Sequence, residues 1–294
     1  MKHQKSPLPI ALLIFAVLAA AWDTLPAGEF DRIRSEVSEP ERAKKSPDSP
    51  PRKNVDDRER DSHPQHIHNG HYRDDNDDDG FLGKFFFGAL TSPFWGPHVA
   101  LRDDFSLPQF FPEHPYENSD GSMLDSKAPS GAHDSSVVLQ GQYGDNFNGI
   151  RHINGRILME NASRIGIDTE FNYRNEEIST GHDELWTGDF NVTYRFAQND
   201  HWQFRTGLGL NWLADRGTSD AGFNFTYGTD WFPTDPWVVT SVIDWGRIGD
   251  ASLFHGRATV GLTHNGWGVF TGYDYFEIGD VDIQSWINGV ELRF

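Results

Sequence analysis

The sequence has no cysteine and no long apolar run, and each absence excludes a class of protein. Without cysteine, its 294 residues form no disulfide framework and have no thiol chemistry. No stretch of 18 apolar residues is present, so the sequence does not support a membrane-spanning helix. The net charge of −19 argues against nucleic acid as a partner. No phosphate-binding glycine loop or zinc-ligand spacing is present, and we expect no cofactor.

The first 21 residues have the pattern of an export signal. Lys2 and Lys5 precede an apolar stretch from Leu8 to Leu18, which is too short to span a bilayer. Three alanines then supply small residues for cleavage, which we expect after Ala21. The alternative is a short membrane anchor, and two prolines near the start of the stretch count against it.

Residues 22–80 predict a disordered acidic linker, because proline and charged residues dominate and large apolar residues are sparse. The tract holds weak candidates for a metal site, which are His63, His66, His68 and His71. The acidic run after them matches the first half of an EF-hand loop, but Phe86 stands where a bidentate glutamate is needed. A solvated linker is therefore favoured over a metal site, and the tract is also a candidate tether for a periplasmic partner.

Residues 81–134 form an aromatic- and proline-rich segment followed by a linker. We expect a short helix from Phe81 to Leu90, and five later prolines exclude a long one. Such an aromatic segment does not sit bare in water. Three placements are open: the periplasmic face of a membrane, which we favour, the space under a barrel mouth, or the surface of a partner.

From residue 135 to residue 294 the pattern changes to strict alternation of apolar and polar side chains. Ten segments of this kind follow one another, each close to the length of a transmembrane strand. The fifth is the most regular, with Trp202, Leu208 and Trp212 on one face and Arg205 on the other. Alternate connections are tight turns, whereas we expect longer loops between them, at 175–183 and 214–221. This arrangement predicts an all-β fold, a closed antiparallel up-and-down barrel of about ten strands.

The last segment carries a resemblance to a known family. Phe294, Leu292, Val290 and Trp286 alternate with polar or small residues up to the end of the sequence. This ending resembles the C-terminal signature of bacterial outer-membrane β-barrels, in which the assembly machinery recognises a terminal phenylalanine. The resemblance implies an outer-membrane location in a Gram-negative-type envelope, with the lipid bilayer and the barrel assembly machinery as partners and Phe294 as the assembly signal.

Two sets of residues favour lipid outside the barrel over a soluble barrel that binds an apolar ligand. All eight tryptophans of this region lie on the apolar face near segment ends, as in two aromatic girdles. They are Trp186, Trp202, Trp212, Trp231, Trp237, Trp245, Trp267 and Trp286. The polar face has no lysine and pairs arginine with carboxylates, which predicts an ion-pair network in a narrow lumen. Its members are Arg156, Arg164, Asp168, Glu170, Asp189, Arg195, Arg205, Asp230, Asp244, Arg257, Asp274, Glu291 and Arg293.

The sequence leaves the biochemical role open between three hypotheses. The first is a structural or narrow-transport barrel, because about ten strands leave no room for a wide aqueous channel. The second is an outer-membrane hydrolase acting on peptide or lipid at the rim, with His182 and Asp183 as the candidate catalytic pair. Neighbouring acids in a loop are more often a solvated loop, so we favour a non-enzymatic role. The third is the soluble barrel.

Overall fold

The computed structural model describes residues 28–38, 93–103, 110–117, 120–124, 132–179, 181–215, 217 and 219–294. The expected export signal, the four histidines of the acidic tract and the expected helix at 81–90 lie outside these residues.

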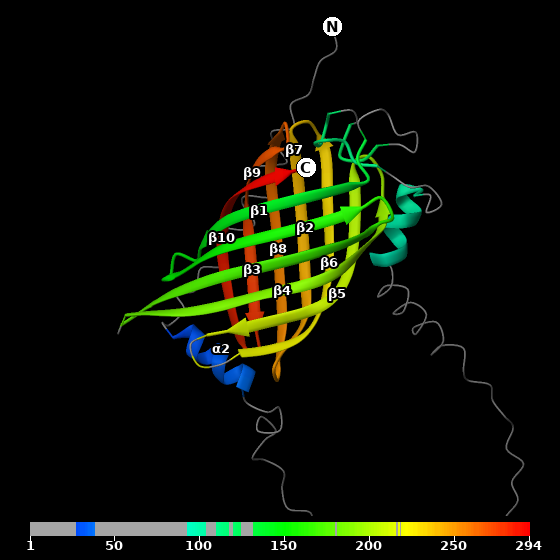
Figure 1. Cartoon of the computed structure of the whole chain (residues 1–294). Helices are drawn as coiled ribbons and strands as arrows, with labels where there is room; N and C mark the ends of the chain where they lie inside the picture. Colours follow the sequence, from blue (N-terminus) through cyan, green and yellow to red (C-terminus); the bar gives the residue numbers. More distant parts are fainter. Residues whose placement is uncertain are drawn as a thin grey trace, which may run out of the picture.

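Ten antiparallel strands form one closed barrel, as the alternation predicts. The strands are β1 (Ser135–Asp145), β2 (Ile150–Asn161), β3 (Ile165–Ile178), β4 (Gly181–Gln198), β5 (Trp202–Ala214), β6 (Ser219–Thr234), β7 (Trp237–Ile248), β8 (Ala251–His264), β9 (Trp267–Ile278) and β10 (Val281–Arg293). Each strand pairs with its sequence neighbours, and β1 closes the cylinder on β10 with Val138 opposite Arg293 (Figure 1). Closure leaves no unpaired sheet edge, the condition that a barrel in a bilayer must meet.

The two ends of the barrel need separate names. The C-terminal mouth is the end at which the backbones of Val137 and Phe294 hydrogen-bond to each other. The far mouth is the opposite end, formed by the β1–β2, β3–β4, β5–β6, β7–β8 and β9–β10 turns. Because the strand number is even, β1 begins and β10 ends at the C-terminal mouth.

The longer loop expected at 175–183 is wrong. β3 continues to Ile178 and β4 begins at Gly181, with Glu177 paired opposite His182. Backbone hydrogen bonds between strands form whether the outward side chains face lipid or water. β3 and β4 therefore remain paired beyond the point where their outward side chains stop being apolar. The connection at 214–221 is likewise short, because β6 starts at Ser219.

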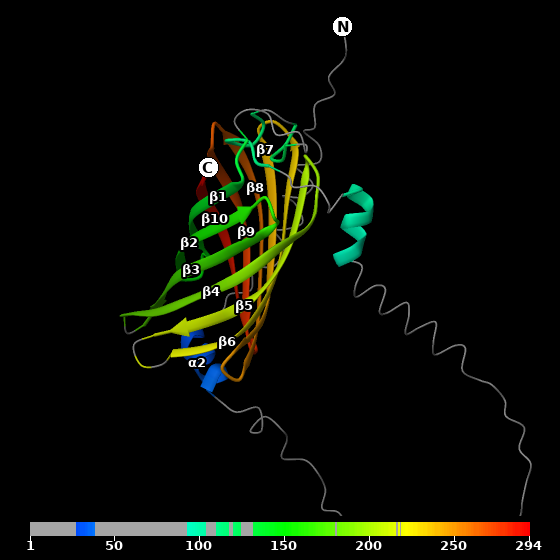
Figure 2. The same ribbon diagram turned by 45° about the vertical axis from the view of Figure 1, so that its right-hand side comes forward.

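Two helices that precede the barrel in the sequence pack against it, one at its far mouth and one against its outer wall. Helix α2 (Glu29–Ser38) lies across the far mouth (Figure 1). A second short helix, residues 93–101, stands beside the wall of the barrel, as the rotated view shows (Figure 2). It contacts the outer face of β4 and β6, where Phe94 packs against Phe196, Phe225 and Tyr227.

The interior is layered along the barrel axis. Aliphatic side chains fill the far mouth together with α2, charged and amide side chains fill the middle, and a smaller apolar group closes the C-terminal mouth. The inward side chains are therefore of two kinds, apolar at the mouths and charged or amide-bearing in the middle. The alternation of side chains along each strand does not by itself distinguish the two.

Candidate functional site

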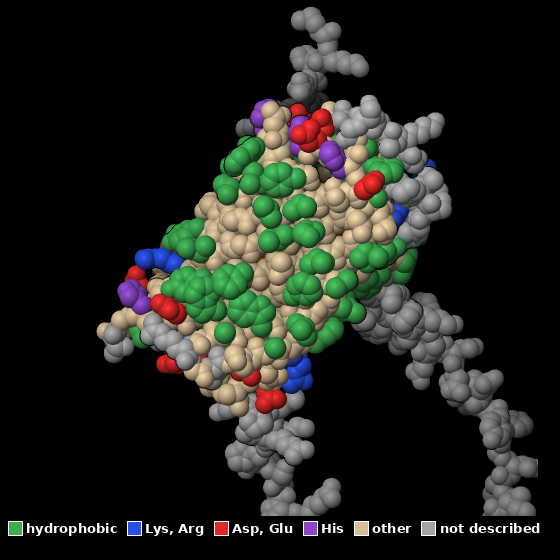
Figure 3. Space-filling view, viewed as in Figure 1, with side chains coloured by type: hydrophobic (Ala, Val, Ile, Leu, Met, Phe, Trp, Pro, Cys, Tyr) green, Lys and Arg blue, Asp and Glu red, His purple; other side chains and the backbone are tan. Residues whose placement is uncertain are grey.

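The polarity of the barrel wall is the reverse of that of a soluble protein. On β5, the outward Leu208 is 58 % exposed, whereas the inward Arg205 is 2 % exposed. The same holds on other strands, and Figure 3 shows apolar side chains spread over the middle of the outer surface with charged ones gathered at its ends. A soluble ligand-binding barrel has the opposite arrangement, with its apolar face inward. The wall is therefore suited to hydrocarbon outside and a polar interior.

Buried ion pairs make up the middle of the lumen. Arg156 donates to both oxygens of Asp168, from Nε at 2.7 Å and from Nη2 at 2.5 Å. Arg205 Nη1 donates to Asp230 Oδ2 at 2.5 Å, and Thr240 donates to the other oxygen of the same carboxylate. The two-pronged geometry of arginine suits a carboxylate in a confined space. Each of these two pairs joins neighbouring strands, β2 to β3 and β5 to β6.

A glycine makes room for one of these pairs. Gly228 lies opposite Arg205 on β6. A Cβ atom at this position would come within 2.8 Å of Arg205 Nε. The Arg205 side chain therefore occupies the space that a larger residue at position 228 would need, so it would have to shift to admit one.

A second group links strands from opposite parts of the wall. Arg257 Nη2 on β8 reaches Glu170 Oε2 on β3 at 2.5 Å, across the lumen. Asn172 donates to the other oxygen of Glu170 at 2.9 Å. Beside them, His255 Nε2 lies 2.8 Å from Asp274 Oδ1. The contact between Arg257 and Glu170 spans the lumen, so the centre of the barrel is filled by protein.

Amide side chains connect the charged groups. Asn224 donates to Asn191 at 3.0 Å and to Asp244 at 3.2 Å, and it accepts from Asn211 at 3.1 Å. Asn191 donates in turn to Asp189 at 2.9 Å. An amide both donates and accepts, so it can join neighbouring acids without adding charge.

The structure places all thirteen side chains of the expected network away from solvent inside the barrel or at its mouth. One of them lies at the C-terminal mouth: Arg164 donates to both oxygens of Asp103, at 2.6 and 2.8 Å, and so joins the segment before the barrel to the β2–β3 turn. Arg174 and Glu176 are also buried in the interior, although neither belongs to the expected network and Glu176 falls within the loop expected at 175–183. Their even spacing from Glu170 and Asn172 was the available signal.

The tryptophans lie on the outer surface at two levels. None of the eight is buried. Trp202 stacks on Trp231 near the C-terminal mouth, with ring centres 5.1 Å apart. Trp245 and Trp267 are each 66 % exposed, and they lie toward opposite ends of the barrel. Exposed indole rings at two levels are costly in water and suited to the two interfaces of a bilayer.

The segment before the barrel closes the C-terminal mouth. The Arg195 guanidinium lies 4.7 Å above the ring of Phe111, and Ser122 Oγ accepts a hydrogen bond from Gln203. Tyr116 donates to the carbonyl of Trp237 at 2.6 Å. Burial raises the pKa of Tyr116, with the nearby Asp235 carboxylate adding to the shift, so the hydroxyl stays protonated as a donor.

At the far mouth the wall changes its polarity. The outward side chains here are charged, and the inward ones are apolar. Those facing out are Arg151, Glu177, Glu184, Arg247, Glu277 and Asp282. Those facing in form one buried cluster with Phe30, Ile33 and Val37 of α2: Ile150, Leu185, Leu213, Ile248, Ala251, Leu253, Phe276, Ile278, Val281 and Ile283. The strand ends at this mouth therefore stand in water around a small core of the ordinary soluble kind.

Polar contacts fix α2 in this mouth. The carboxylate of Glu176 accepts from the backbone amides of Gly28, Glu29 and Phe30, at 2.6, 2.9 and 3.1 Å, and so caps the first turn. Arg34 donates to both oxygens of Asp183, at 2.6 and 2.8 Å, and also pairs with Asp215. Hydrogen bonding to Asp183 is the main cause that raises the pKa of Arg34 above its usual range.

The candidate catalytic pair is not assembled. His182 is exposed at the start of β4, while Asp183 binds Arg34 of α2. A general base of the His–carboxylate kind needs the two side chains within hydrogen-bond reach. Asp183 is therefore engaged in holding α2, a role that sequence reasoning missed because α2 is remote in the chain.

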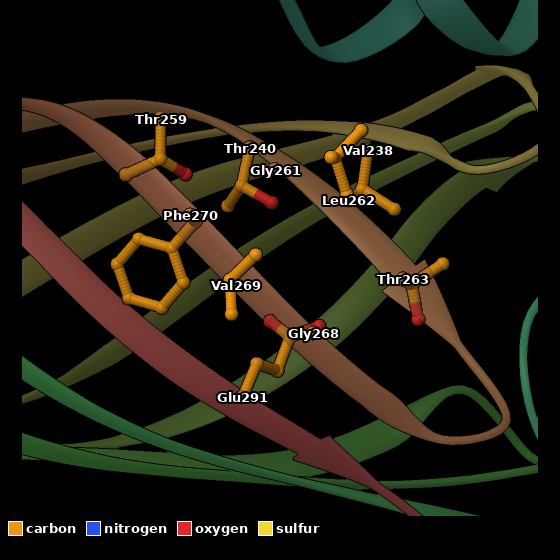
Figure 4. Close-up of a pocket in the computed structure, with 10 residues that line it drawn as sticks. All are labelled: Val238, Thr240, Thr259, Gly261, Leu262, Thr263, Gly268, Val269, Phe270 and Glu291. Carbon is orange, nitrogen blue, oxygen red and sulfur yellow. The ribbon is translucent and has the colours of Figure 1, made fainter.

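The cavities in the described part of the chain range from an open pocket of about 330 Å³ beside Tyr116, His201 and Asp235 to small spaces between strands. One lies in the wall between β7, β8, β9 and β10, beside Thr240, Thr263 and Glu291 (Figure 4). Its volume of about 10 Å³ is room for one water molecule. Within the described ranges no group of three or more His, Asp or Glu side chains has metal-ligand spacing. No helix among those residues is long and apolar enough to cross a membrane.

No family model matches the sequence, and no curated protein matches it. Solved structures do match. The NanC porin has 9 % identity and a TM-score of 0.37, with 53 % of this chain and 98 % of that chain covered. The outer membrane protein Ail of Yersinia pestis has 16 % identity and a TM-score of 0.30, covering 54 % and 98 %. The translocator domain of autotransporter NalP from Neisseria meningitidis has 12 % identity and a TM-score of 0.31, covering 74 % and 98 %.

The strand pairing itself shows a closed antiparallel barrel of ten strands. These matches concern the strand architecture, and what the barrel does depends on the residues that fill and close it in this chain.

Proposed function

We propose that the chain is an integral outer-membrane β-barrel with a structural role, closed to solutes in its resting state. The observation that supports this is the filled lumen: arginine–carboxylate pairs such as Arg156–Asp168 and Arg257–Glu170 occupy the axis of the barrel. Segments of the same chain cover each mouth. The exposed apolar belt favours the bilayer as the surrounding medium, because water outside Leu208 and its neighbours costs about 25 cal/mol for each Å² of apolar surface.

The proposal includes an orientation. We place the C-terminal mouth in the periplasm, since an even-stranded barrel assembled from that side keeps the start of its first strand and the end of its last strand there. The assembly machinery would bind the final strand at Phe294, which is 58 % exposed at this mouth. The far mouth and α2 then face the outside of the cell.

A filled lumen excludes a general porin and fits a membrane anchor. An anchor of this kind presents its periplasmic segments and its external mouth to other molecules and passes no solute between them. Narrow transport remains the second role for the same barrel, and it requires that ion pairs at the axis separate to form a path.

Two measurements test the proposal. Alkaline washing of membranes is expected to leave the protein in the pellet, whereas detergent extracts it. Reconstituted in a planar bilayer, the purified protein is expected to give no steady current. Release by alkali alone contradicts the membrane assignment, and a steady single-channel current contradicts the closed resting state while leaving the membrane assignment standing.

A further inference from the structure

Helix α2 occupies a site that the far mouth builds for it. Phe30 and Ile33 are fully buried against inward aliphatic residues of the strand ends. The carbonyl of Val37 accepts from the backbone amide of Asp250 in the β7–β8 turn at 3.1 Å. Together with the Glu176 cap, these contacts bind the start, the middle and the end of the helix. Figure 1 shows α2 lying against this end of the cylinder.

The two arginines of α2 have different roles. Arg32 pairs with Glu29 of the same helix, at 3.1 Å, and its side chain is 51 % exposed. Arg34 is 24 % exposed and pairs with barrel residues, Asp183 at 2.6 Å and Asp215. Asp183 belongs to β4, and Asp215 follows β5, so Arg34 joins the helix to two neighbouring strands.

We propose that the far mouth is a helix-binding site and that α2 is its ligand, held as a releasable plug by the Arg34 clamp and the Glu176 cap. The helix makes no backbone ladder with the barrel, so its attachment depends on one apolar face and these polar contacts. Ten residues do not form a stable helix alone in water, so α2 is ordered by the site that binds it. The position of the plug outside the cell rests on the membrane orientation proposed above.

Release of α2 uncovers an apolar recess ringed by acids. The recess is lined by Leu185, Leu213, Ile248 and Ile278, and Asp183 and Asp215 stand at its edge. This chemistry selects a short amphipathic helix with a basic residue on the margin of its apolar face. Within the chain, α2 has that composition, and it is present at high effective concentration because it is covalently attached.

The absence of cysteine allows a clean test by single-cysteine labelling of the full-length protein. Ile33→Cys reports the buried face of α2, and Ser35→Cys reports its exposed face. With a maleimide reagent, Ser35→Cys is expected to react at least tenfold faster than Ile33→Cys. Adding Arg34→Ala is expected to raise the Ile33→Cys rate at least tenfold. Arg32→Ala, the comparison variant in the same helix, removes only the pair with Glu29 and is expected to raise the Ile33→Cys rate by a much smaller factor than Arg34→Ala does.

Three outcomes overturn the plug. They are equal rates at the two cysteines, no acceleration by Arg34→Ala, or equal acceleration by both arginine variants. Because Ile33→Cys removes part of the apolar face, Val37→Cys is measured as a second buried reporter, and both are expected to respond alike. A separate peptide adds a further criterion. A synthetic peptide of residues 28–38 is expected to slow the labelling of Ile33→Cys in the Arg34→Ala protein. The same peptide carrying Arg34→Ala is expected to be at least tenfold less effective.

The side of the membrane is measured separately on intact cells with an impermeant maleimide. Asp280→Cys lies in the β9–β10 turn at the far mouth, and His264→Cys lies at the C-terminal mouth. Ser35→Cys is expected to label together with Asp280→Cys, before lysis, and His264→Cys only after lysis. If Asp280→Cys also requires lysis, the proposed orientation is wrong. The plug is then judged by the effect of Arg34→Ala on the labelling of Ile33→Cys alone. If Asp280→Cys labels and Ser35→Cys does not, the plug is wrong.

Discussion

Removal of one member of a buried ion pair provides the most direct test of the filled lumen. Arg156 and Asp168 form two hydrogen bonds, of 2.7 and 2.5 Å, and their side chains are 3 % and 5 % exposed. Arg156→Ala leaves the carboxylate of Asp168 buried without its main partner. Breaking a buried pair in this way costs about 3–5 kcal/mol, because the remaining charge has lost its compensation. We expect a loss of that size in the free energy of unfolding.

A surface pair on the same strand supplies the control. Arg151 lies 3.1 Å from Glu177, but these side chains are 52 % and 48 % exposed. An exposed pair contributes less than about 1 kcal/mol, so Arg151→Ala is expected to change little. The double variant Arg156→Met with Asp168→Leu replaces the pair by apolar volume, and it is expected to recover most of the stability.

The assay is urea unfolding in phospholipid vesicles, followed by tryptophan fluorescence and approached from both the folded and the unfolded side. A loss below about 1 kcal/mol for Arg156→Ala, equal to that of the surface control, would refute the view that the lumen is a closed set of matched charges. In that case water reaches Asp168 freely, and a narrow conducting path becomes the better description of the barrel.

Three further predictions concern the outer face and the plug. Leu208→Arg, at the middle of β5, is expected to cost about 2–4 kcal/mol in vesicles, whereas Ser252→Arg near the far mouth is expected to cost at most about 1 kcal/mol; a soluble barrel would show no such difference. Lipids brominated near the headgroups are expected to quench tryptophan fluorescence more than lipids brominated at the chain ends, and Trp245→Phe and Trp267→Phe are each expected to reduce that difference. Burial raises the pKa of Glu29 in α2, with Arg32 opposing the shift and Glu176 and Asp282 adding to it. A raised pKa in the docked state favours docking at low pH, so hydrogen-exchange protection of α2, corrected for intrinsic rates, is expected to fall as pH rises through that pKa.

Each of these results has a matched reference. Glu29→Gln is expected to remove the pH dependence of α2 protection, and an unchanged dependence would show that another group is responsible. For the outer face, equal costs of Leu208→Arg and Ser252→Arg would contradict a hydrocarbon environment. Quenching that is uniform with bromine depth would contradict a placement of the two tryptophans at the membrane interfaces.

The sequence by itself was sufficient for the barrel and for its polarity. A strand has a side-chain period of two, so alternation from residue 135 onward determines which side chains share a face, and the structure confirms the ten strands and their closure. The period separates Leu208 from Arg205, and the tryptophan positions and the lysine-free polar face, which are also read from the sequence, predict that Leu208 is the one facing outward. Such patterns are local, and a linear sequence contains them completely.

The tertiary structure alone decided what closes the barrel and where its polarity changes. The pairing of Arg34 with Asp183 joins residues 149 positions apart, and no periodic signal relates them. The same is true of Glu176, which appeared to be part of an acidic loop and instead caps the first turn of α2. The inward apolar residues at the far mouth alternate with outward residues just as the charged lumen residues do. Their burial is explained by α2, whose apolar face packs among them. Side chains that meet across a closed barrel are determined by its circumference and register, which a one-dimensional pattern does not specify.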